Sequence, residues 1–316
     1  TQPKMTAAMS VDEGKAPATA TPETAGPKEG ESVSGEGESA PTPKPETVTI
    51  TPPPEPQGPW PGRYLFVSVP GTALDDATKS LLAEYKPGGV VLSPENLVDE
   101  AQTREFIKEI KEAVGLGLDA ARLPLIAVAQ EGGPDFNPLR LDPAPSPAEL
   151  AAKNDPNEVR QTAKRYAEAA RSLGIGVILG PVLEVFDAAA ENPNFKARTF
   201  GEKAKEVVPL GFAFAEGLIE GGVSPVVKYY PGLGTTKMVD GLLTLQKSEI
   251  RELAALLYPF SEAANRKMPC ILVSHPAVPL VDLEDPKRPA SISPALVQKV
   301  VRGQWLYEGV LLADDF

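Results

Sequence analysis

Short apolar runs alternate with longer amphipathic stretches from residue 62 onward, and this alternation constrains the fold more than any other feature. Seven runs are rich in β-branched and other apolar residues: YLFVSV (64–69), GGVVLS (88–93), PLIAVA (124–129), GVILGP (176–181), SPVVKY (224–229), CILVSH (270–275) and GVLLAD (309–314). The stretches between them include TREFIKEIKEAV, NEVRQTAKRYAEAARSLG and EIRELAALLYPFSEAAN, in which apolar residues recur every three or four positions. Such alternation predicts βα units around a parallel sheet.

Strands that are apolar on both faces fit either a doubly wound open sheet or a closed (β/α)8 barrel of the TIM type. The turn after the first run reads SVPGT and lacks the GxGxxG spacing of dinucleotide-binding folds, so the barrel is the better prediction. The seventh run ends just before Phe316. We therefore expect a barrel truncated after its seventh strand, with an open edge that a missing segment, a partner or the chain's own tail would cover.

The first 61 residues have a different composition from the rest. Proline, glutamate, threonine, serine, alanine and glycine dominate, large apolar residues are almost absent, and the tract ends in TPPPEPQGPWPG. Such a sequence cannot bury a core and favours extended polyproline conformation. We predict an acidic Pro/Glu/Thr-rich tether over 1–61 and a folded domain over 62–316. The alternative is a segment that orders on a protein partner, with Trp60 as its anchor.

Charge and cysteine content argue against several classes of function. The formal net charge of −12, with no basic patch, disfavours nucleic acid or an anionic membrane as a partner. No apolar stretch approaches the length of a transmembrane segment, and no basic-then-apolar leader opens the chain. The only cysteine, Cys270, stands in the apolar run CILVSH, which predicts a buried core thiol. No metal-ligand cluster or nucleotide motif is recognisable, so we expect no cofactor.

Polar residues gather where the predicted strands end, which is where barrel enzymes carry their chemistry. The segments PGGVVL, AVAQEGG, LGPVLEV, ARTFG, VVKYYPGLGTT, PASISPAL and YEGVLLADD follow one another between residues 87 and 315. In order and spacing they resemble segments of the bacterial family 3 β-N-acetylhexosaminidases, retaining glycoside hydrolases that trim cell-wall amino sugars. The resemblance covers residues 62–316 and implies a barrel with its site at the strand C-termini.

The resemblance also implies roles for individual residues. Asp314 takes the position of the nucleophile that attacks the anomeric carbon and forms a glycosyl-enzyme. The sugar-binding positions correspond to Arg198, Lys228, His275, Glu131 and Glu184, the last standing where the family usually has aspartate. Two interpretations stay open for Arg198 and Lys228: contact with sugar, or internal ion pairing with a neighbouring carboxylate such as Glu184.

Other residues near the strand ends are expected to be structural. Asp315 fits a role in the turn after the seventh strand. Tyr229, Tyr230 and Trp305 fit packing in the walls and core better than a platform for sugar stacking.

The chain departs from the family pattern where a proton should be donated. The family carries Asp-x-His on a loop after KHFPGHGDT, whereas this chain reads KYYPGLGTTKMVDGLLTL, and alignment from Lys228 without gaps puts Val239 and Gly241 at those two positions. Neither side chain holds a proton, and a general acid contributes a factor of roughly 10² to 10⁴. The sugar-gripping segment Asp-Gln-Glu-Gly-Gly-Arg also becomes 129–134 AQEGGP, which loses a carboxylate and a guanidinium.

Three functions follow from these observations. The preferred one is a degenerate glycosidase that binds an amino-sugar glycan or peptidoglycan with little or no turnover. The second is a working glycosidase that recruits an acid such as Glu95, Glu131 or Asp135. The third is a non-catalytic structural or interaction subunit that docks through residues 1–61 or the open barrel edge. The resemblance to cell-wall recycling enzymes points to the bacterial envelope, but it does not fix the compartment.

Overall fold

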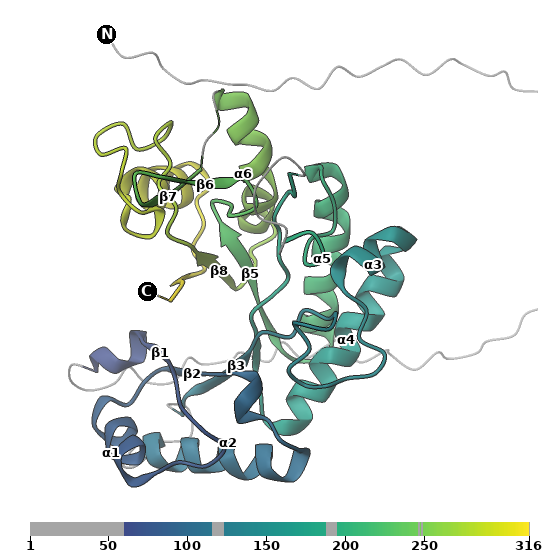
Figure 1. The fold of residues 1–316 in the computed structure, drawn as a ribbon, viewed down its shortest axis with the longest axis vertical. Helices are drawn as coiled ribbons and strands as arrows, with labels where there is room; N and C mark the ends of the chain where they lie inside the picture. Colours follow the sequence, from purple (N-terminus) through teal and green to yellow (C-terminus); the bar gives the residue numbers. More distant parts are fainter. Residues whose placement is uncertain (1–59, 116–122, 188–194, 246, 248, 316) are drawn as a thin grey trace, which may run out of the picture. The chain divides into compact units, whose positions relative to one another are not determined.

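A computed structural model of the chain describes residues 60–115, 123–187, 195–245, 247 and 249–315. Seven parallel strands form a curled sheet in the order β1-β2-β3-β4-β5-β8-β9 (Figure 1). The strands are β1 (Phe66–Ser68), β2 (Gly89–Leu92), β3 (Leu125–Val128), β4 (Val177–Ile178), β5 (Ser224–Tyr230), β8 (Cys270–Val273) and β9 (Val310–Ala313). Each coincides with one of the seven predicted runs, with β5 extending one residue beyond its run, so the truncated α/β barrel expected from the sequence is confirmed.

Helices connect consecutive strands and lie on the outside of the sheet (Figure 1). They are α1 (Asp76–Tyr85), α2 (Glu100–Gly115), α3 (Pro147–Lys153), α4 (Pro156–Leu173), α5 (Ala204–Glu220), α6 (Ile250–Asn265) and the π-helical segment η6 (Ala295–Gln304). The described connections also contain the short 3-10 turns η1 (Pro61–Tyr64), η2 (Pro94–Asn96) and η5 (Ala290–Ile292). Local sequence sets the helix starts: the Asp155 side chain, for example, accepts hydrogen bonds from two backbone N–H groups of the first turn of α4.

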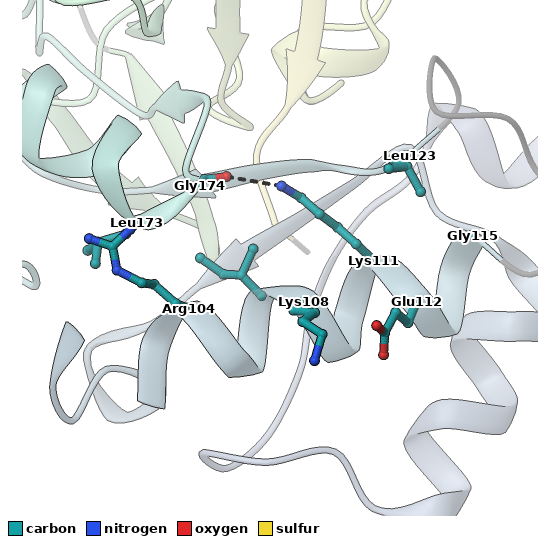
Figure 2. Close-up of a pocket in the computed structure, with 9 residues that line it drawn as sticks. Arg104, Lys108, Lys111, Glu112, Gly115, Leu123, Leu173 and Gly174 are labelled. Atoms are coloured by element: carbon teal, nitrogen blue, oxygen red, sulfur yellow. Dashed lines mark hydrogen bonds between the residues drawn. The ribbon is translucent and has the colours of Figure 1, made fainter. Parts of the chain in front are cut away.

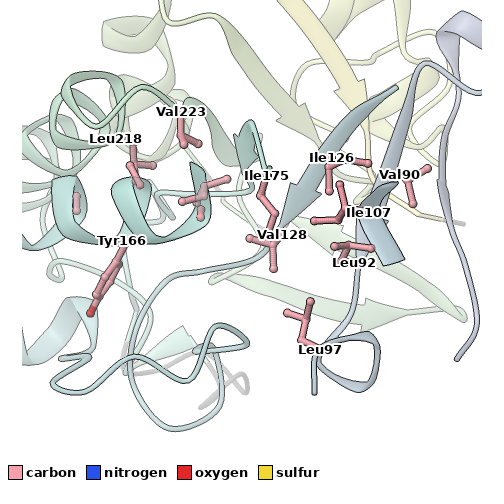
Figure 3. Close-up of a cluster of buried hydrophobic side chains, with 14 of the residues drawn as sticks. Val90, Leu92, Leu97, Ile107, Ile126, Val128, Tyr166, Ile175, Leu218 and Val223 are labelled. Atoms are coloured by element: carbon pink, nitrogen blue, oxygen red, sulfur yellow. The ribbon is translucent and has the colours of Figure 1, made fainter. Parts of the chain in front are cut away.

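The interior strands β2, β5 and β8 bury most of both faces, as their apolar sequences predicted, whereas the outer strands β1 and β9 are more exposed. Val90 and Leu92 of β2 point to one side and pack with Ile107 of α2 in the cluster between sheet and helices (Figure 3). The alternate residues form a second, smaller cluster on the inner face of the sheet, made of Ala127, Val177, Val226, Cys270 and Leu272. Cys270 is buried there as expected, and burial raises the pKa of its thiol to about 12. It is therefore a packing residue.

The outermost strands of the sheet, β1 and β9, each pair with one neighbour among the described strands. Large apolar side chains are exposed beside both of these edges: Tyr64 is 72% exposed, and Val310 in β9 is 61% exposed. The open edge expected from the sequence is therefore present on both outer strands of the described sheet.

A second, two-stranded sheet was not predicted from the sequence. Strands β6 (Thr236–Val239) and β7 (Leu242–Leu245) form an antiparallel hairpin. The two residues that connect them, Asp240 and Gly241, have φ values of 49° and 79°. Positive φ at both central positions is the geometry of a type I′ turn, for which Asp-Gly is a preferred sequence. The segment aligned with the family's acid-bearing loop is thus a tight β-hairpin.

The described part of the chain begins at Trp60, whose indole Nε1–H donates to the carbonyl oxygen of Lys86 at 2.6 Å. The predicted tether over 1–61 lies almost entirely outside the described residues and stays a prediction. In the ranges that are described, no helix combines the length and apolar character needed to cross a bilayer.

Candidate active site

Glu131, Arg198 and Lys228 form a buried ion cluster at the strand ends. Arg198 donates from Nε and Nη2 to the two carboxylate oxygens of Glu131 at 2.8 and 2.6 Å, and Lys228 Nζ lies 2.6 Å from Oε1 of the same group. Glu131 is 1% exposed and Lys228 is 2% exposed. Burial alone raises the pKa of Glu131, but Lys228 and Arg198 outweigh burial and hold that pKa below its usual value. Glu131 is therefore ionised at neutral pH.

The backbone around Glu131 fixes the direction of its side chain. The N–H groups of Glu131 and Gly132 both donate to the carbonyl oxygen of Phe136 at 2.9 Å. Gly132 has φ of +98°, and a Cβ there would lie 2.2 Å from the carbonyl oxygen of Pro145. Only glycine fits this turn, so the EGG sequence after β3 is what turns the Glu131 carboxylate toward the two cations.

Aromatic rings surround the Arg198 guanidinium. Its Cζ lies 3.8 Å from the ring centroid of Phe136, 5.2 Å from that of Phe195 and 5.4 Å from that of Tyr229. Nη2 also donates to the hydroxyl oxygen of Tyr229 at 2.6 Å. Such stacking and bidentate pairing are typical of a structurally anchored arginine. These contacts correspond to the ion-pairing interpretation, but the partner is Glu131, so the suggestion of Glu184 as that partner was wrong.

Glu184 holds the loop that follows β5. Its Oε1 accepts the N–H of Leu233 at 2.9 Å, and its Oε2 accepts the N–H of Gly234 at 3.1 Å. Complete burial raises the pKa of Glu184 to about 7, although these backbone amides act in the opposite direction. The structure thus directs Glu184 to the backbone between β5 and the hairpin and not into the ion cluster.

Asp314 and His275 meet at the ends of the last two strands of the sheet. Asp314 Oδ2 accepts a hydrogen bond from Ser274 Oγ at 3.2 Å. Burial first, and then the charge of Asp315, raise the pKa of Asp314. His275 Nε2 lies 3.2 and 3.0 Å from the carbonyl oxygens of Asp314 and Asp315, and its Nδ1 lies 2.7 Å from Ser291 Oγ. Neither serine was predicted as part of the site, although Ser291 lies in PASISPAL and Ser274 directly precedes His275.

The position expected for a general acid is at the tip of the hairpin. Val239 precedes the turn, Gly241 closes it, and the exposed Asp240 lies 3.7 Å from Lys287. The recruited acids considered from the sequence fare differently: Glu95 and Asp135 are exposed, while Glu131 is occupied by two cations. Within the described ranges, no group of three or more His, Cys, Asp or Glu side chains could hold a metal ion.

The described residues also line hollows outside this cluster, the larger of which are a groove and a pocket. The groove, of about 660 Å³, lies beside the hairpin, and the residues that line it include Val239, Leu242, Leu245, Pro279, Leu280 and Pro286. A second pocket, of about 610 Å³, lies on the helical outside between α2 and the end of α4 (Figure 2). Lys111 there donates to the Gly174 carbonyl at 3.3 Å, and Lys108 pairs with Glu105 at 2.8 Å. Lys111 and Lys108 are thus already paired with a carbonyl and a carboxylate, and the residues that line this pocket include none from the C-terminal ends of the strands.

Of the three aromatic residues expected to be structural, Tyr230 lies in the core and the partly buried Trp305 packs against it. Tyr230 is fully buried and makes edge-on contacts with Phe260 and Trp305, at centroid distances of 5.6 and 5.5 Å. Tyr229 lies at the ion cluster instead, where its hydroxyl touches Arg198. Tyr229 is thus the aromatic residue of the three that belongs to the candidate site.

A parallel barrel sheet with carboxylates and cations at its strand C-termini has the architecture of a barrel glycosidase. The chain belongs to glycosyl hydrolase family 3: the model of the family's N terminal domain matches residues 64–316. This confirms the resemblance found in the sequence.

Known relatives agree with this assignment. A beta-hexosaminidase of Idiomarina loihiensis is 28% identical over 261 residues, which cover 79% of this chain and 74% of the relative. The structure of a family 3 β-N-acetylglucosaminidase from Paenibacillus sp. superimposes with a TM-score of 0.70 at 27% identity, covering 80% of this chain and 48% of that one. A β-N-acetylhexosaminidase from Beutenbergia cavernae gives a TM-score of 0.71 at 25% identity, covering 80% and 76%. The chain thus spans about half of the Paenibacillus structure.

Proposed function

We propose that this chain is a family 3 barrel that binds an amino-sugar glycan at its strand ends and hydrolyses it poorly or not at all. One observation carries the proposal: the residues aligned with the acid-bearing loop form a β-hairpin whose tip is the Asp240-Gly241 turn. The choice of an amino-sugar ligand is supported by the relatives, which are named as hexosaminidases.

A retaining glycosidase needs a nucleophile and a separate acid/base. Asp314 is the candidate nucleophile, but Glu131 and Glu184, the buried carboxyl groups that follow other strands, are poor acids. Glu131 is kept ionised by Arg198 and Lys228. Glu184 holds a proton more readily, with a pKa of about 7, yet it is completely buried and both of its oxygens accept backbone N–H groups. Without an acid, the loss in rate is of the order of 10² to 10⁴.

Hydrolysis is tested with 4-nitrophenyl N-acetyl-β-glucosaminide. We expect the wild-type chain to release nitrophenol no faster than Asp314→Asn. Clear hydrolysis that disappears in Asp314→Asn would refute the proposed impairment and would point to an acid recruited from elsewhere.

Binding is tested separately by calorimetry with N-acetylglucosamine and its β-1,4-linked dimer. Arg198→Lys is the informative variant, because it keeps a cation beside Glu131 while removing the planar fork that recognises hydroxyl and carboxylate groups. We expect weaker binding in this variant and none of that loss in the exposed control Arg171→Lys. Equal affinity in all three proteins would remove Arg198 from the ligand site.

The second candidate is a non-catalytic subunit of the cell envelope that docks through the open barrel edge or the N-terminal tract. Exposed Tyr64, Leu306 and Val310 beside the outer strands favour it, because exposed apolar strand edges promote association. Sedimentation of wild type and Val310→Lys tests the edge. Association that is lost in the variant supports this function, and a monomer in both proteins argues against it.

A further inference from the structure

We infer that Ser291, acting through His275, is a positioning residue for Asp314. The pair holds the Asp314–Asp315 turn so that Asp314 can attack sugar donors whose leaving group needs no proton. This inference rests on the proposed function, because it takes Asp314 as the nucleophile of the same site.

The hydrogen-bond partners fix the direction of the Ser291–His275 contact. His275 Nε2 faces two backbone carbonyl oxygens, those of Asp314 and Asp315, at 3.2 and 3.0 Å. Carbonyl oxygens only accept, so Nε2 carries a hydrogen. In the neutral imidazole Nδ1 is then an acceptor, and Ser291 Oγ, 2.7 Å away, donates to it. The chain of donors therefore runs from the serine hydroxyl through the imidazole to the backbone carbonyls.

This arrangement supports the end of a strand that has little other support. Among the described strands β9 pairs only with β8, and the bond from Asp314 N to the Val273 carbonyl, 2.9 Å long, is the last of that ladder. Beyond it, Ser274 holds the Asp314 carboxylate and His275 holds the carbonyls of residues 314 and 315. Side chain and main chain of Asp314 are thus both held by Ser274 and His275, the two residues that directly follow β8. Catalytic groups on such ordered supports keep the geometry that reaction requires.

A nucleophile held in this way can act without an acid when the leaving group is a weak base. With 2,4-dinitrophenyl N-acetyl-β-glucosaminide, an Asp314 oxygen forms a bond to C1, the bond from C1 to the aryl oxygen breaks, and its electron pair leaves as dinitrophenolate. The product is a glycosyl ester of Asp314. Added azide then attacks C1, displaces the Asp314 carboxylate and gives the glycosyl azide. No proton transfer is needed in either step.

The imidazole is tested first, because His275 is the single histidine of the chain and its NMR signals need no assignment. In protein labelled with 15N-histidine at pH 8, we expect a protonated Nε2 and a bare Nδ1. Ser291→Ala should shift the Nδ1 resonance, while Ser291→Thr, which keeps a hydroxyl, should restore it. The control Ser172→Ala, an exposed helix residue, should leave the spectrum unchanged. A wild-type spectrum with the proton on Nδ1 would overturn the inference.

The consequence for Asp314 is tested with the dinitrophenyl donor and azide. We expect a burst of dinitrophenolate, an added sugar mass on Asp314 and, with azide, glycosyl azide. Ser291→Ala should slow the burst about 10-fold to 100-fold, as expected for a displaced reactive group, and Ser291→Thr should recover most of the rate. A burst that is equal in Ser291→Ala and wild type would overturn the positioning role.

The two proposals fail in distinguishable ways. If the wild-type chain binds sugar in calorimetry but gives no burst, Asp314 is not a competent nucleophile and the inference falls, while glycan binding without turnover stands. If the chain hydrolyses the nitrophenyl glycoside with an acid of its own, the proposed impairment falls. The comparison of Ser291→Ala with Ser291→Thr still decides the positioning role in that case.

Discussion

Glu131→Gln is the substitution for which the structure predicts the largest loss of stability. Glutamine has nearly the same shape as glutamate, so packing at this buried position is preserved. What is lost is the negative charge that lies 2.6 Å from Lys228 Nζ and 2.6 Å from Arg198 Nη2. Two cations then remain in the interior without a counter-charge. Removing one member of a buried ion pair typically destabilises a protein by about 3–5 kcal/mol.

The expected loss in Glu131→Gln can be compared with the total stability of the domain and with the effect of a second substitution at Lys228. Domains of this kind unfold with about 5–15 kcal/mol, so the expected loss is a substantial part of the total. Lys228→Met removes one of the two orphaned charges. We therefore expect the double variant Glu131→Gln/Lys228→Met to lose less than the sum of the two single losses, with a coupling of about 1–3 kcal/mol.

Urea unfolding followed by circular dichroism measures these differences, with exposed Glu95→Gln as the matched control that should change stability by less than about 0.5 kcal/mol. The pH dependence adds a second readout. The lowered pKa of Glu131 means that its stabilisation is present above about pH 4.5, its usual value, and is lost as pH falls further. A loss below about 1 kcal/mol in Glu131→Gln, with no change in acid sensitivity, would refute the buried ion cluster.

Three further outcomes are expected. Because the pKa of Glu184 is raised to about 7, wild-type stability should fall as pH rises from about 5 to 7, and Glu184→Gln should flatten that slope in urea titrations; an unchanged slope would contradict the buried carboxyl. Gly241→Ala, at φ of 79°, should cost about 1–2 kcal/mol in the same assay, and an unchanged or higher urea midpoint would contradict the left-handed turn. Trypsin should cut the N-terminal tract, after Lys28 for example, before any site beyond residue 62, and resistance would instead indicate a docked segment.

The strands could be predicted well from the sequence because the apolar pattern of a parallel barrel strand is contained in a few consecutive residues. A run such as CILVSH is apolar on both faces and lies between amphipathic stretches, so its secondary structure depends little on distant residues. The hairpin was missed although MVDGLL contains Asp-Gly between apolar pairs, which is a strong hairpin signal. The family resemblance predicted a loop at this position, whereas the local Asp-Gly turn makes it a hairpin.

The pairing within the candidate site was harder to predict, because it depends on which loops meet in space. Both Glu131 and Glu184 follow strands, and nothing in the local sequence says that Glu131 would take the cations. The structure decides it through the turn at Gly132 and through the backbone amides of Leu233 and Gly234, which occupy Glu184. Similarly, Ser291 lies 16 positions from His275, and only the fold brings them together.

The place of β9 at the border of the sheet has a consequence for the dynamics of the site. A ladder with one neighbour exchanges its amide protons by small local openings that an interior strand does not permit. Asp314 is carried at the end of that ladder, so its freedom should follow the exchange rates of Val310–Ala313. Whatever covers this border, whether more of the chain or another molecule, would slow that exchange and stiffen the carboxylate at the same time.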